Sequence, residues 1–541
     1  MDAKQDKSTN KPPQREGLRA VLHAWRYFFV ILGLLALVAL YYLEEDWRGQ
    51  RTWQNYQAEL KTQGLPTAAS DLIPPPVSDA ENFAMTPLLA SVFNQAAGSQ
   101  MWPERKAVER VQTFSGGYSR ATTRRDSGPG HPANSWLLSG IDLVACYGAV
   151  LESTNSPYSE REKSITPKVT LSEAARGILA SLADLQPVFD ELRSSSKRPY
   201  ARFNLQYDDP NPEEILLPHL SLLKSLCQLL QVRACAELAL DKSDAAFGDV
   251  QLMLRLMNAT RQEPIIISQL VRFALLHLAL QPIAEGIPQW SDAQLRQLEL
   301  ELEQIDFCAD TKRALEAEAV FFGRRVIDYV WQSQRRGSAA VLAGFGDQWQ
   351  GNLAIVGLLI RMAPHGWFYL EQVNQERMVQ DDLLPTIDLK DHEISPGATR
   401  RAESRIAQLT GCSPVTLFLR HRFFSGLLLP ATAKVTQRTA FAQTGAGLAS
   451  LACALERCRR AQGAYPNSLD SLVPRFIDRL PHDVINGKPL IYRLDSGGQY
   501  LLYSVGWNEK DDGGSFAAGK EDRSVVQDQG DWVWRPAKPR R

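Results

Sequence analysis

Seventeen consecutive residues near the N-terminus, YFFVILGLLALVALYYL from Tyr27 to Leu43, carry no formal charge. This length is the lower limit for an α-helix that crosses the hydrocarbon core of a bilayer. Aromatic side chains of the kind that settles at membrane interfaces stand at both ends of the run. They are Phe28 and Phe29 at the start, and Tyr41, Tyr42 and Trp47 at the end. The run therefore predicts a transmembrane helix at residues 27–43.

The charges on the two sides of this run differ in sign. Basic residues precede it, at Lys4, Lys7, Lys11, Arg15, Arg19 and Arg26. Acidic residues follow it directly, at Glu44, Glu45 and Asp46. Since cytoplasmic flanks carry the excess of Lys and Arg, we expect residues 1–26 to form a basic cytoplasmic tail. Everything after Leu43 is then expected to lie outside the cytoplasm.

Two other interpretations of the run are a cleaved signal peptide and a buried core helix. Signal-peptide cleavage is disfavoured because the run ends in ALYYLE, without the small-x-small pattern of a cleavage site. A prepilin-type leader is disfavoured as well, since Gly17 is followed by Leu22 at the position where that processing signal wants Glu. The sequence favours an uncleaved single-pass anchor.

The balance of charges limits the partners. The chain has 541 residues with 60 Lys and Arg against 61 Asp and Glu, so its net charge is -1. A nearly neutral chain has no electrostatic case for binding nucleic acid, and no nucleic-acid partner is expected. Hydrophobic residues make up 44% of the chain, which is enough to form buried cores. A chain of this length is expected to contain about two to four structural units of roughly 100–200 residues each.

The seven cysteines form no C-x-x-C pair and are odd in number. An extracytoplasmic location permits disulfides. However, neither Cys227 with Cys235 nor Cys453 with Cys458 has the spacing to bridge within its own predicted helix. Small buried thiols are the expectation, and the question of disulfides between distant positions stays open.

Composition divides the remainder of the chain into three regions. Residues 44–135 form a linker and mixed region, with a predicted helix at Arg48–Gln63. The segment Asp71-Leu-Ile-Pro-Pro-Pro-Val77 predicts an extended spacer, because successive prolines fix φ and remove hydrogen-bond donors. Residues 136–430 form a helical domain. Residues 431–541 begin with a long helix and continue as a small sheet domain.

Within the helical domain, apolar residues recur at helical spacing almost throughout residues 170–384. They predict a helical hairpin around Asp241-Lys242-Ser243 and a further helix at 265–284. They also predict a helix opened by Ser291-Asp292 and another at 310–334. An irregular bundle and a solenoid-like stack both fit this succession.

A second apolar run, LAIVGLLI, occupies residues 353–360. It is too short to span a bilayer. It predicts a core helix, and a segment that dips into the membrane is the alternative.

The pattern changes after Gly463, which is expected to end a long helix that starts at about residue 431. Downstream, residues 489–493, 499–504 and 531–534 predict short strands, and Asp495-Ser-Gly-Gly498 predicts the hairpin turn between the first two. The predicted fold class is therefore mainly α. It consists of an N-terminal transmembrane helix, an irregular helical bundle or solenoid-like body, and a small C-terminal α+β domain with an antiparallel sheet.

A series of short motifs runs from Leu455 to Gly514. They are Gly463-Ala-Tyr-Pro466, the Leu-rich Leu469–Val473, Leu480-Pro-His-Asp483, Gly487-Lys-Pro489 and Tyr503-Ser-Val-Gly506, followed by an acidic glycine loop. In this order they resemble the globular domain of type II secretion major pseudopilins. The whole chain resembles large uncharacterised bacterial membrane-anchored proteins that carry such a domain at the C-terminus. The resemblance implies the cytoplasmic (inner) membrane of a bacterium as the location, with the bulk of the chain on the periplasmic side.

The chain departs from the pseudopilins in one respect. Their membrane helix is continuous with the long helix of the globular domain, whereas here the whole helical domain separates the two. This departure argues against assembly into a pilus-like filament.

Pseudopilin domains of this type often hold Ca²⁺ in the acidic loop, so the resemblance implies a calcium site. The candidate ligands are Asp511, Asp512, Asp528 and Asp531. Asn508 and backbone oxygens near Ser504 are candidates to complete the set, because hard cations take several carboxylate and carbonyl oxygens. The alternative is a solvated acidic loop that Gly513 and Gly514 stiffen.

The sequence contains none of three common catalytic motifs: G-x-S-x-G, H-E-x-x-H and the Walker A loop. No catalytic or cofactor-binding residue is predicted. The favoured function is a membrane-anchored extracytoplasmic scaffold or assembly component, linked to secretion or envelope organisation, with protein partners of unknown identity. The alternative is an envelope enzyme whose site is assembled from distant residues of the helical domain.

Overall fold

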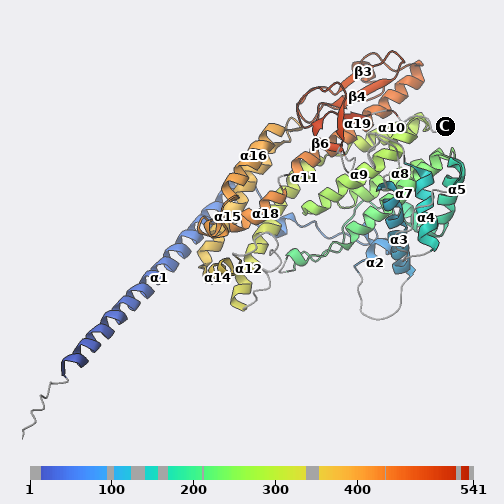
Figure 1. Cartoon of the computed structure of the whole chain (residues 1–541). Helices are drawn as coiled ribbons and strands as arrows, with labels where there is room; N and C mark the ends of the chain where they lie inside the picture. Colours follow the sequence, from blue (N-terminus) through green and yellow to red (C-terminus); the bar gives the residue numbers. More distant parts are fainter. Residues whose placement is uncertain are drawn as a thin grey trace, which may run out of the picture.

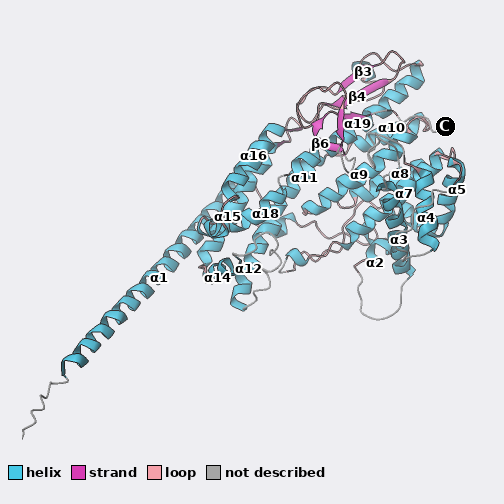
Figure 2. Ribbon diagram, in the orientation of Figure 1, coloured by secondary structure: helices cyan, strands magenta, loops and turns pink. Residues whose placement is uncertain are grey.

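The computed structural model describes residues 14–93, 103–123, 141–155, 168–209, 212–336, 353–432, 434–518, 525–534 and 536. These residues form a mainly helical protein with a long N-terminal apolar helix and small antiparallel sheets toward the C-terminus (Figure 2). The predicted fold class is confirmed in this form. Six of the seven cysteines are buried, as expected.

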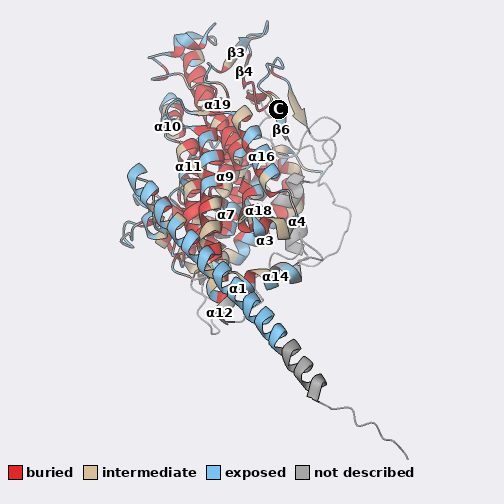
Figure 3. Cartoon of the chain, turned by 90° about the vertical axis from the view of Figure 1, so that its left-hand side faces the viewer, coloured by how far each residue is buried: buried red, intermediate tan, exposed pale blue. Residues whose placement is uncertain are grey.

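Helix α1 (Gln14–Gln63) leaves the rest of the molecule as a single rod (Figure 1). Its apolar part is exposed (Figure 3), with exposed fractions of 61% at Leu35 and 64% at Leu37. By length and composition this helix is able to cross a membrane. A continuous apolar surface of this size is unfavourable in water. The helix runs unbroken past Leu43, so the predicted transmembrane helix and the helix predicted at 48–63 are one element.

Helices α2 to α9 form the first part of the body. They are α2 (Pro87–Ser91), α3 (Pro103–Thr123), α4 (Leu143–Asn155), α5 (Leu171–Ser181), α6 (Gln186–Ser195), α7 (Pro218–Leu238), α8 (Ser243–Asn258) and α9 (Ile266–Gly286). The predicted hairpin is formed by α7 and α8, whose turn contains Asp241 at a φ of 58°. Helix α9 also has the length and composition to cross a membrane, but most of it is buried, so it is a core helix.

The next helices follow their local sequence signals. Ser291 caps α10 (Asp292–Glu303) by accepting a hydrogen bond from the backbone N–H of Gln294, whose side chain returns to the Ser291 backbone. Helix α11 (Phe307–Ala317) continues through a π-helical turn (Glu318–Gly323) into α12 (Arg324–Arg336). The helix predicted at 310–334 is therefore present, with one wide turn inside it.

A second group of helices surrounds the point where α1 meets the body. It contains α14 (Leu353–Met362), α15 (His365–Met378), α16 (Pro396–Thr410), α17 (Pro414–Leu419) and α18 (Phe423–Thr432), with the hairpin β1 (Ile387–Asp388) and β2 (Glu393–Ile394) between α15 and α16. Helices α12, α14, α15, α17 and α18 enclose a smaller apolar core, in which Trp367 and Phe424 are buried. Helix α15 packs along α1.

Helix α14 corrects one prediction. The LAIVGLLI run does form a helix, but Ile355 and Leu358 are 54% and 57% exposed. Of the described apolar residues in the run, only Ile360 is buried. The run is not a core helix, because the described residues cover it on one side only.

Helix α19 (Val435–Gln462) ends at Gly463, whose φ of 83° is the left-handed conformation that suits glycine. The end is as predicted. The start is later than residue 431, because α18 occupies the chain up to Thr432. Helix α19 packs against α9, α10 and α11, and most of its residues as far as Cys458 are buried. It is therefore a core helix of the body as well as the first element of the C-terminal region.

Three strands, β3 (Ile491–Leu494), β4 (Tyr500–Ser504) and β7 (Trp532–Trp534), form an antiparallel sheet in the order β3-β4-β7. The predicted hairpin is present, with Leu494 opposite Tyr500. Strands β5 (Phe516–Ala518) and β6 (Val525–Gly530) form a second pair that the sequence pattern did not predict. The sheets lie along α19, at the top of the molecule in Figure 1.

Candidate functional site

The four candidate calcium ligands occupy three places around the C-terminal strands. Asp511 and Asp512 lie in the turn between β4 and β5. Asp528 lies on β6, where it is exposed. Asp531 is fully buried between β6 and β7.

Asp531 organises the turn before β5. Its carboxylate accepts hydrogen bonds from the backbone N–H of Asp512 at 3.2 Å and from that of Gly514 at 2.7 Å. Burial raises the pKa of Asp531, the two hydrogen bonds oppose this rise, and the nearby charges of Asp512 and Asp511 add to it. The structure therefore brings three of the four candidates together, and we refer to Asp511, Asp512 and Asp531 as the acidic turn.

Asp511 already has a cationic partner. Nη2 of Arg493 lies 2.8 Å from Oδ2 of Asp511, and the Tyr503 hydroxyl donates to Oδ1 at 2.8 Å. The Tyr503 hydrogen bond, the backbone N–H of Gly513 and the charge of Arg493 all lower the pKa of Asp511. A metal ion bound here would have to compete with Arg493 for this carboxylate.

The acidic turn supplies three carboxylates, but they are not arranged as the ligands of a metal ion. Within the residues that the structure describes, no group of three or more His, Cys, Asp or Glu side chains has the arrangement of a metal site. Asp512 is exposed and accepts a hydrogen bond from Nδ2 of Asn508 at 2.7 Å. Gly513 and Gly514 have φ angles of 72° and 80°, which fix the path of the turn. Calcium binding would require the side chains of Asp511 and Asp512 to turn toward Asp531.

A buried aspartate that was not predicted as a functional residue connects two of the quoted motifs. Asp483 accepts hydrogen bonds from the Ser504 hydroxyl at 2.9 Å and from the backbone N–H groups of Val505 at 3.1 Å and Ile485 at 3.0 Å. Burial raises the pKa of Asp483, and these hydrogen bonds oppose the rise. The Leu-Pro-x-Asp motif and the Tyr-Ser-x-Gly motif are thus joined at one carboxylate, which positions the chain that enters the acidic turn.

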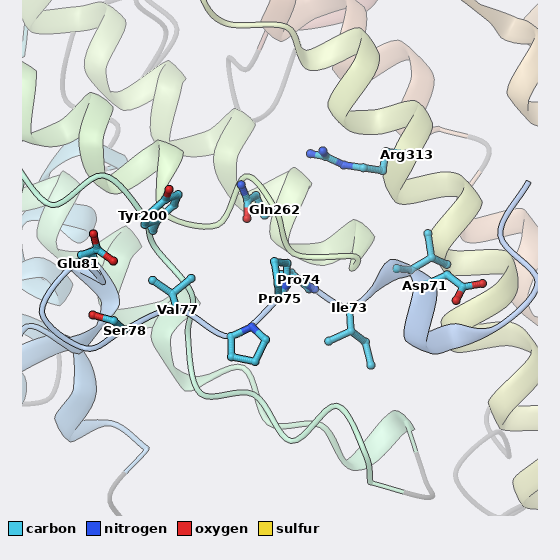
Figure 4. A pocket seen from close by; sticks show the side chains of 12 residues that line it. Asp71, Ile73, Pro74, Pro75, Val77, Ser78, Glu81, Tyr200, Gln262 and Arg313 are labelled. Atoms are coloured by element: carbon cyan, nitrogen blue, oxygen red, sulfur yellow. The ribbon is translucent and has the colours of Figure 1, made fainter.

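The proline segment predicted to be extended forms one wall of an open cleft of about 560 Å³ (Figure 4). Arg202 donates to the carbonyl of Pro74 within the segment at 3.0 Å, and Arg324 donates to the carbonyl of Thr67, just before the segment, at 2.7 Å. The opposite wall comes from separate parts of the helical body: Tyr200, Gln262 and Arg313.

The lining of this cleft combines apolar and polar side chains. Arg313 is half exposed and lies 3.0 Å from Asp310. Asp71 accepts hydrogen bonds from the backbone N–H groups of Thr67 and Ala68, so it caps its own turn. The described residues that line the cleft include Ser78 but no histidine or lysine that could act as its base. The polar side chains of the lining are those of Asp71, Ser78, Glu81, Tyr200, Gln262 and Arg313.

The contact between α1 and α15 is the third candidate site, and we call it the anchor junction. The two helices touch through backbone atoms at Gly49 and Gly366. A Cβ atom on Gly366 would lie 2.6 Å from the Cα of Asp46 and would overlap the backbone oxygen of Glu45. A Cβ atom on Gly49 would lie 2.6 Å from the carbonyl carbon of Gly366. Only glycine permits so close an approach at these two positions.

Polar groups surround the contact between Gly49 and Gly366. They belong to the first turns of α1 after Leu43 and to the part of the body packed against it. The Glu45 carboxylate is buried, lies 2.5 Å from Nε2 of His421 and also contacts Arg48. The backbone N–H of Gly366 donates to Oδ1 of Asp46 at 2.7 Å. Burial lowers the pKa of His421, while Glu45 opposes this fall. Glu45 and Asp46, which the sequence shows only as acidic residues after the apolar stretch, thus form the polar contacts between α1 and the body.

Aromatic packing extends the anchor junction along α1. Trp53 stacks on Tyr369 of α15 with ring centroids 5.9 Å apart and an interplanar angle of 16°. The Arg324 guanidinium lies 4.6 Å from the centroid of the Trp53 ring. Tyr56 is buried with Val373 in the same small apolar cluster. Helix α1 is therefore fixed to the body over several turns.

Comparison of the chain with protein-family models, with curated proteins and with solved structures finds no significant match. The function therefore has to be inferred from the molecule itself.

Proposed function

We propose that the protein is a single-pass, membrane-anchored scaffold or assembly component whose bulk lies outside the cytoplasm, on the periplasmic side of a bacterial inner membrane. The anchor junction carries this proposal. Within a few residues after Leu43, α1 changes from an exposed apolar rod to a helix whose Glu45 is buried against the body. An anchor built in this way presents a folded body at the membrane surface instead of leaving it on a loose tether.

The orientation follows from the charges on both sides of the apolar stretch. Six basic residues precede Tyr27, whereas Glu44, Glu45 and Asp46 directly follow Leu43, and the first basic residue on that side is Arg48. The positive-inside rule then keeps the N-terminus in the cytoplasm. The body, with its proline-walled cleft and its C-terminal sheets, is then outside.

Protease treatment of intact spheroplasts tests this topology. With one epitope tag at each end of the full chain, we expect external protease to remove the C-terminal tag. The N-terminal tag should survive on a short fragment, because the basic tail is on the cytoplasmic side. A cytoplasmic protein that stays intact is the control for sealed cells. Protection of the C-terminal tag would overturn the topology, and an N-terminal tag that is already separate before protease treatment would identify a cleaved signal peptide.

The C-terminal region supports a pseudopilin-like domain as part of the proposal. A long helix, a short 3₁₀ turn at Leu469–Leu472 and a three-stranded antiparallel sheet follow each other in the order that the motifs imply. The Asp483 contacts join two of those motifs. However, α19 is buried in the body and is a separate element from α1. We therefore propose a fixed module of the scaffold rather than the subunit of a filament held together by its long helices.

A calcium site in the acidic turn remains part of the proposal, and its test is a titration of the full chain in detergent. If Ca²⁺ binds only the folded protein, thermal stability should rise with concentration, by about 1.4 kcal/mol for each tenfold increase beyond saturation. The gain should be absent in Asp512→Ala and should persist in Asp391→Ala, which removes an exposed carboxylate in the β1–β2 turn. Asp528→Ala decides whether the exposed carboxylate on β6 takes part. A melting temperature that does not change with Ca²⁺ would leave the turn as a solvated acidic loop.

A further inference from the structure

Helix α14 presents an apolar stripe to the outside of the molecule. Ile355, Leu358 and Met362 are 54%, 57% and 58% exposed. Their spacing of three and four residues places them on one face of the helix. The opposite side packs against the small core, where Ile360 is buried near Leu417 of α17.

The position of α14 is set by the anchor. The Tyr42 hydroxyl donates a hydrogen bond to the carbonyl of Met362 at the end of α14. Tyr42 is the penultimate residue of the apolar stretch that ends at Leu43. Figures 1 and 3 both show α14 beside α1 at the place where the rod enters the body. The exposed stripe of α14 therefore lies at the level where α1 emerges from a bilayer.

The residues around the stripe fit the same environment. Leu419, at the end of α17, is 69% exposed. Arg361 and Arg420 are exposed next to these apolar side chains. Apolar residues flanked by cationic ones are typical of a helix that lies in the interface, with its apolar face among the acyl chains and its charges at the phosphate groups.

We propose that α14 is a second membrane contact, with Ile355, Leu358 and Met362 inserted in the outer leaflet beside α1. This inference rests on the proposed function, because α14 reaches lipid only if α1 spans the membrane. Lipid is the favoured occupant because the hydrogen bond to Tyr42 fixes α14 at the height of the headgroups, where lipid is the surrounding medium. A protein partner or a second copy of the chain would have to displace that lipid.

Fluorescence quenching in lipid nanodiscs that hold one copy of the full chain tests the inference. A cysteine introduced as Leu358→Cys carries an environment-sensitive dye, in a background in which the partly buried Cys412 is replaced by serine and the six buried cysteines stay in place. Lipids with a nitroxide on the acyl chain serve as the quencher. Leu35→Cys, in the exposed apolar part of α1, reports whether the anchor is in the bilayer. Leu300→Cys on α10 is the control, because α10 lies far from α1 in Figure 1.

We expect quenching at Leu358 to be at least half of that at Leu35 and several-fold above that at Leu300. Ile355→Cys should behave like Leu358→Cys, since the two residues share a face. Quenching at Leu35 with Leu358 no different from Leu300 would overturn the inference and leave the anchor intact. Absence of quenching at Leu35 would overturn the anchor and the inference together. Protection of Leu358 only in discs that hold two copies would identify a second copy as the occupant and would also overturn the lipid contact.

Discussion

Replacing Asp310 by alanine is expected to lower the free energy of unfolding by about 3–5 kcal/mol, because it leaves a buried charge without its partner. Asp310 is buried and pairs with Arg272, Arg261 and Arg313, each at 3.0 Å. Arg272 is fully buried. Burial lowers the pKa of Arg272 to about 10, and Asp310 opposes this fall. Chemical unfolding of the full chain in detergent, followed by tryptophan fluorescence, measures the loss.

A matched control comes from the same cluster. Arg261 is 44% exposed, and a partly solvated partner contributes about 0–1 kcal/mol. Arg261→Ala should therefore cost far less than Asp310→Ala. Equal losses for the two variants would show that the buried pair with Arg272 is not what stabilises this part of the body. Because Arg313 also lines the proline-walled cleft, the Asp310 variant should alter that wall as well.

Replacing Gly366 by alanine is expected to separate α1 from α15. The new Cβ atom would meet backbone atoms of Glu45 and Asp46, which cannot turn aside as a side chain would. Overpacking of this kind costs about 1–3 kcal/mol and sometimes more. The measurement is the rate of limited proteolysis within residues 44–63 in nanodiscs, together with the midpoint of unfolding. We expect faster cleavage and a lower midpoint.

The matched control for this variant is Gly116→Ala. Gly116 lies in the interior of α3, and nothing is within 4 Å of the position that its Cβ would take. Alanine there should stabilise the helix by roughly 0.5–1 kcal/mol, because it lowers the entropy of the unfolded chain. A Gly366 variant that resembles the Gly116 variant in both readouts would contradict the close contact at the anchor junction.

Much of the fold could be predicted because its signals are local. Ser291 and Gly463 mark helix ends through their own backbone preferences, and Asp495-Ser-Gly-Gly498 marks a turn in the same way. The β5–β6 pair gave no such signal, since its strands are short and their pairing is irregular. The exposure of α14 was not predictable either. An apolar run indicates that a helix will be covered, and only the tertiary structure shows that one side of it is not.

The candidate sites also contain some residues that the local sequence indicates and some contacts that only the tertiary structure shows. Asp512 and Asp531 are both among the predicted calcium ligands, and the backbone N–H of Asp512 donates a hydrogen bond to the carboxylate of Asp531. The pairing of Asp511 with Arg493 depends on β3 lying next to β4, which a charge count cannot show. The contact of Gly49 with Gly366 joins residues far apart in the chain, and neither stands in a motif. Asp483 belongs to the motif Leu480-Pro-His-Asp483, so its burial and its hydrogen bonds to the Tyr-Ser-x-Gly motif could have been predicted from the sequence.

The stiffness of α1 has a consequence for how the body is presented. The stretch of 17 uncharged residues is about 26 Å long as a helix, slightly shorter than a typical hydrocarbon core of about 30 Å. A short span favours an upright helix and a locally thinned bilayer over a tilted helix. If α1 spans a membrane as proposed, any tilt of that helix is passed on to the body, because α1 enters the body without a break and is fixed there. In the proposed topology, copies in one membrane would share a common axis, and a partner that binds them there would lose less rotational entropy than it would in solution.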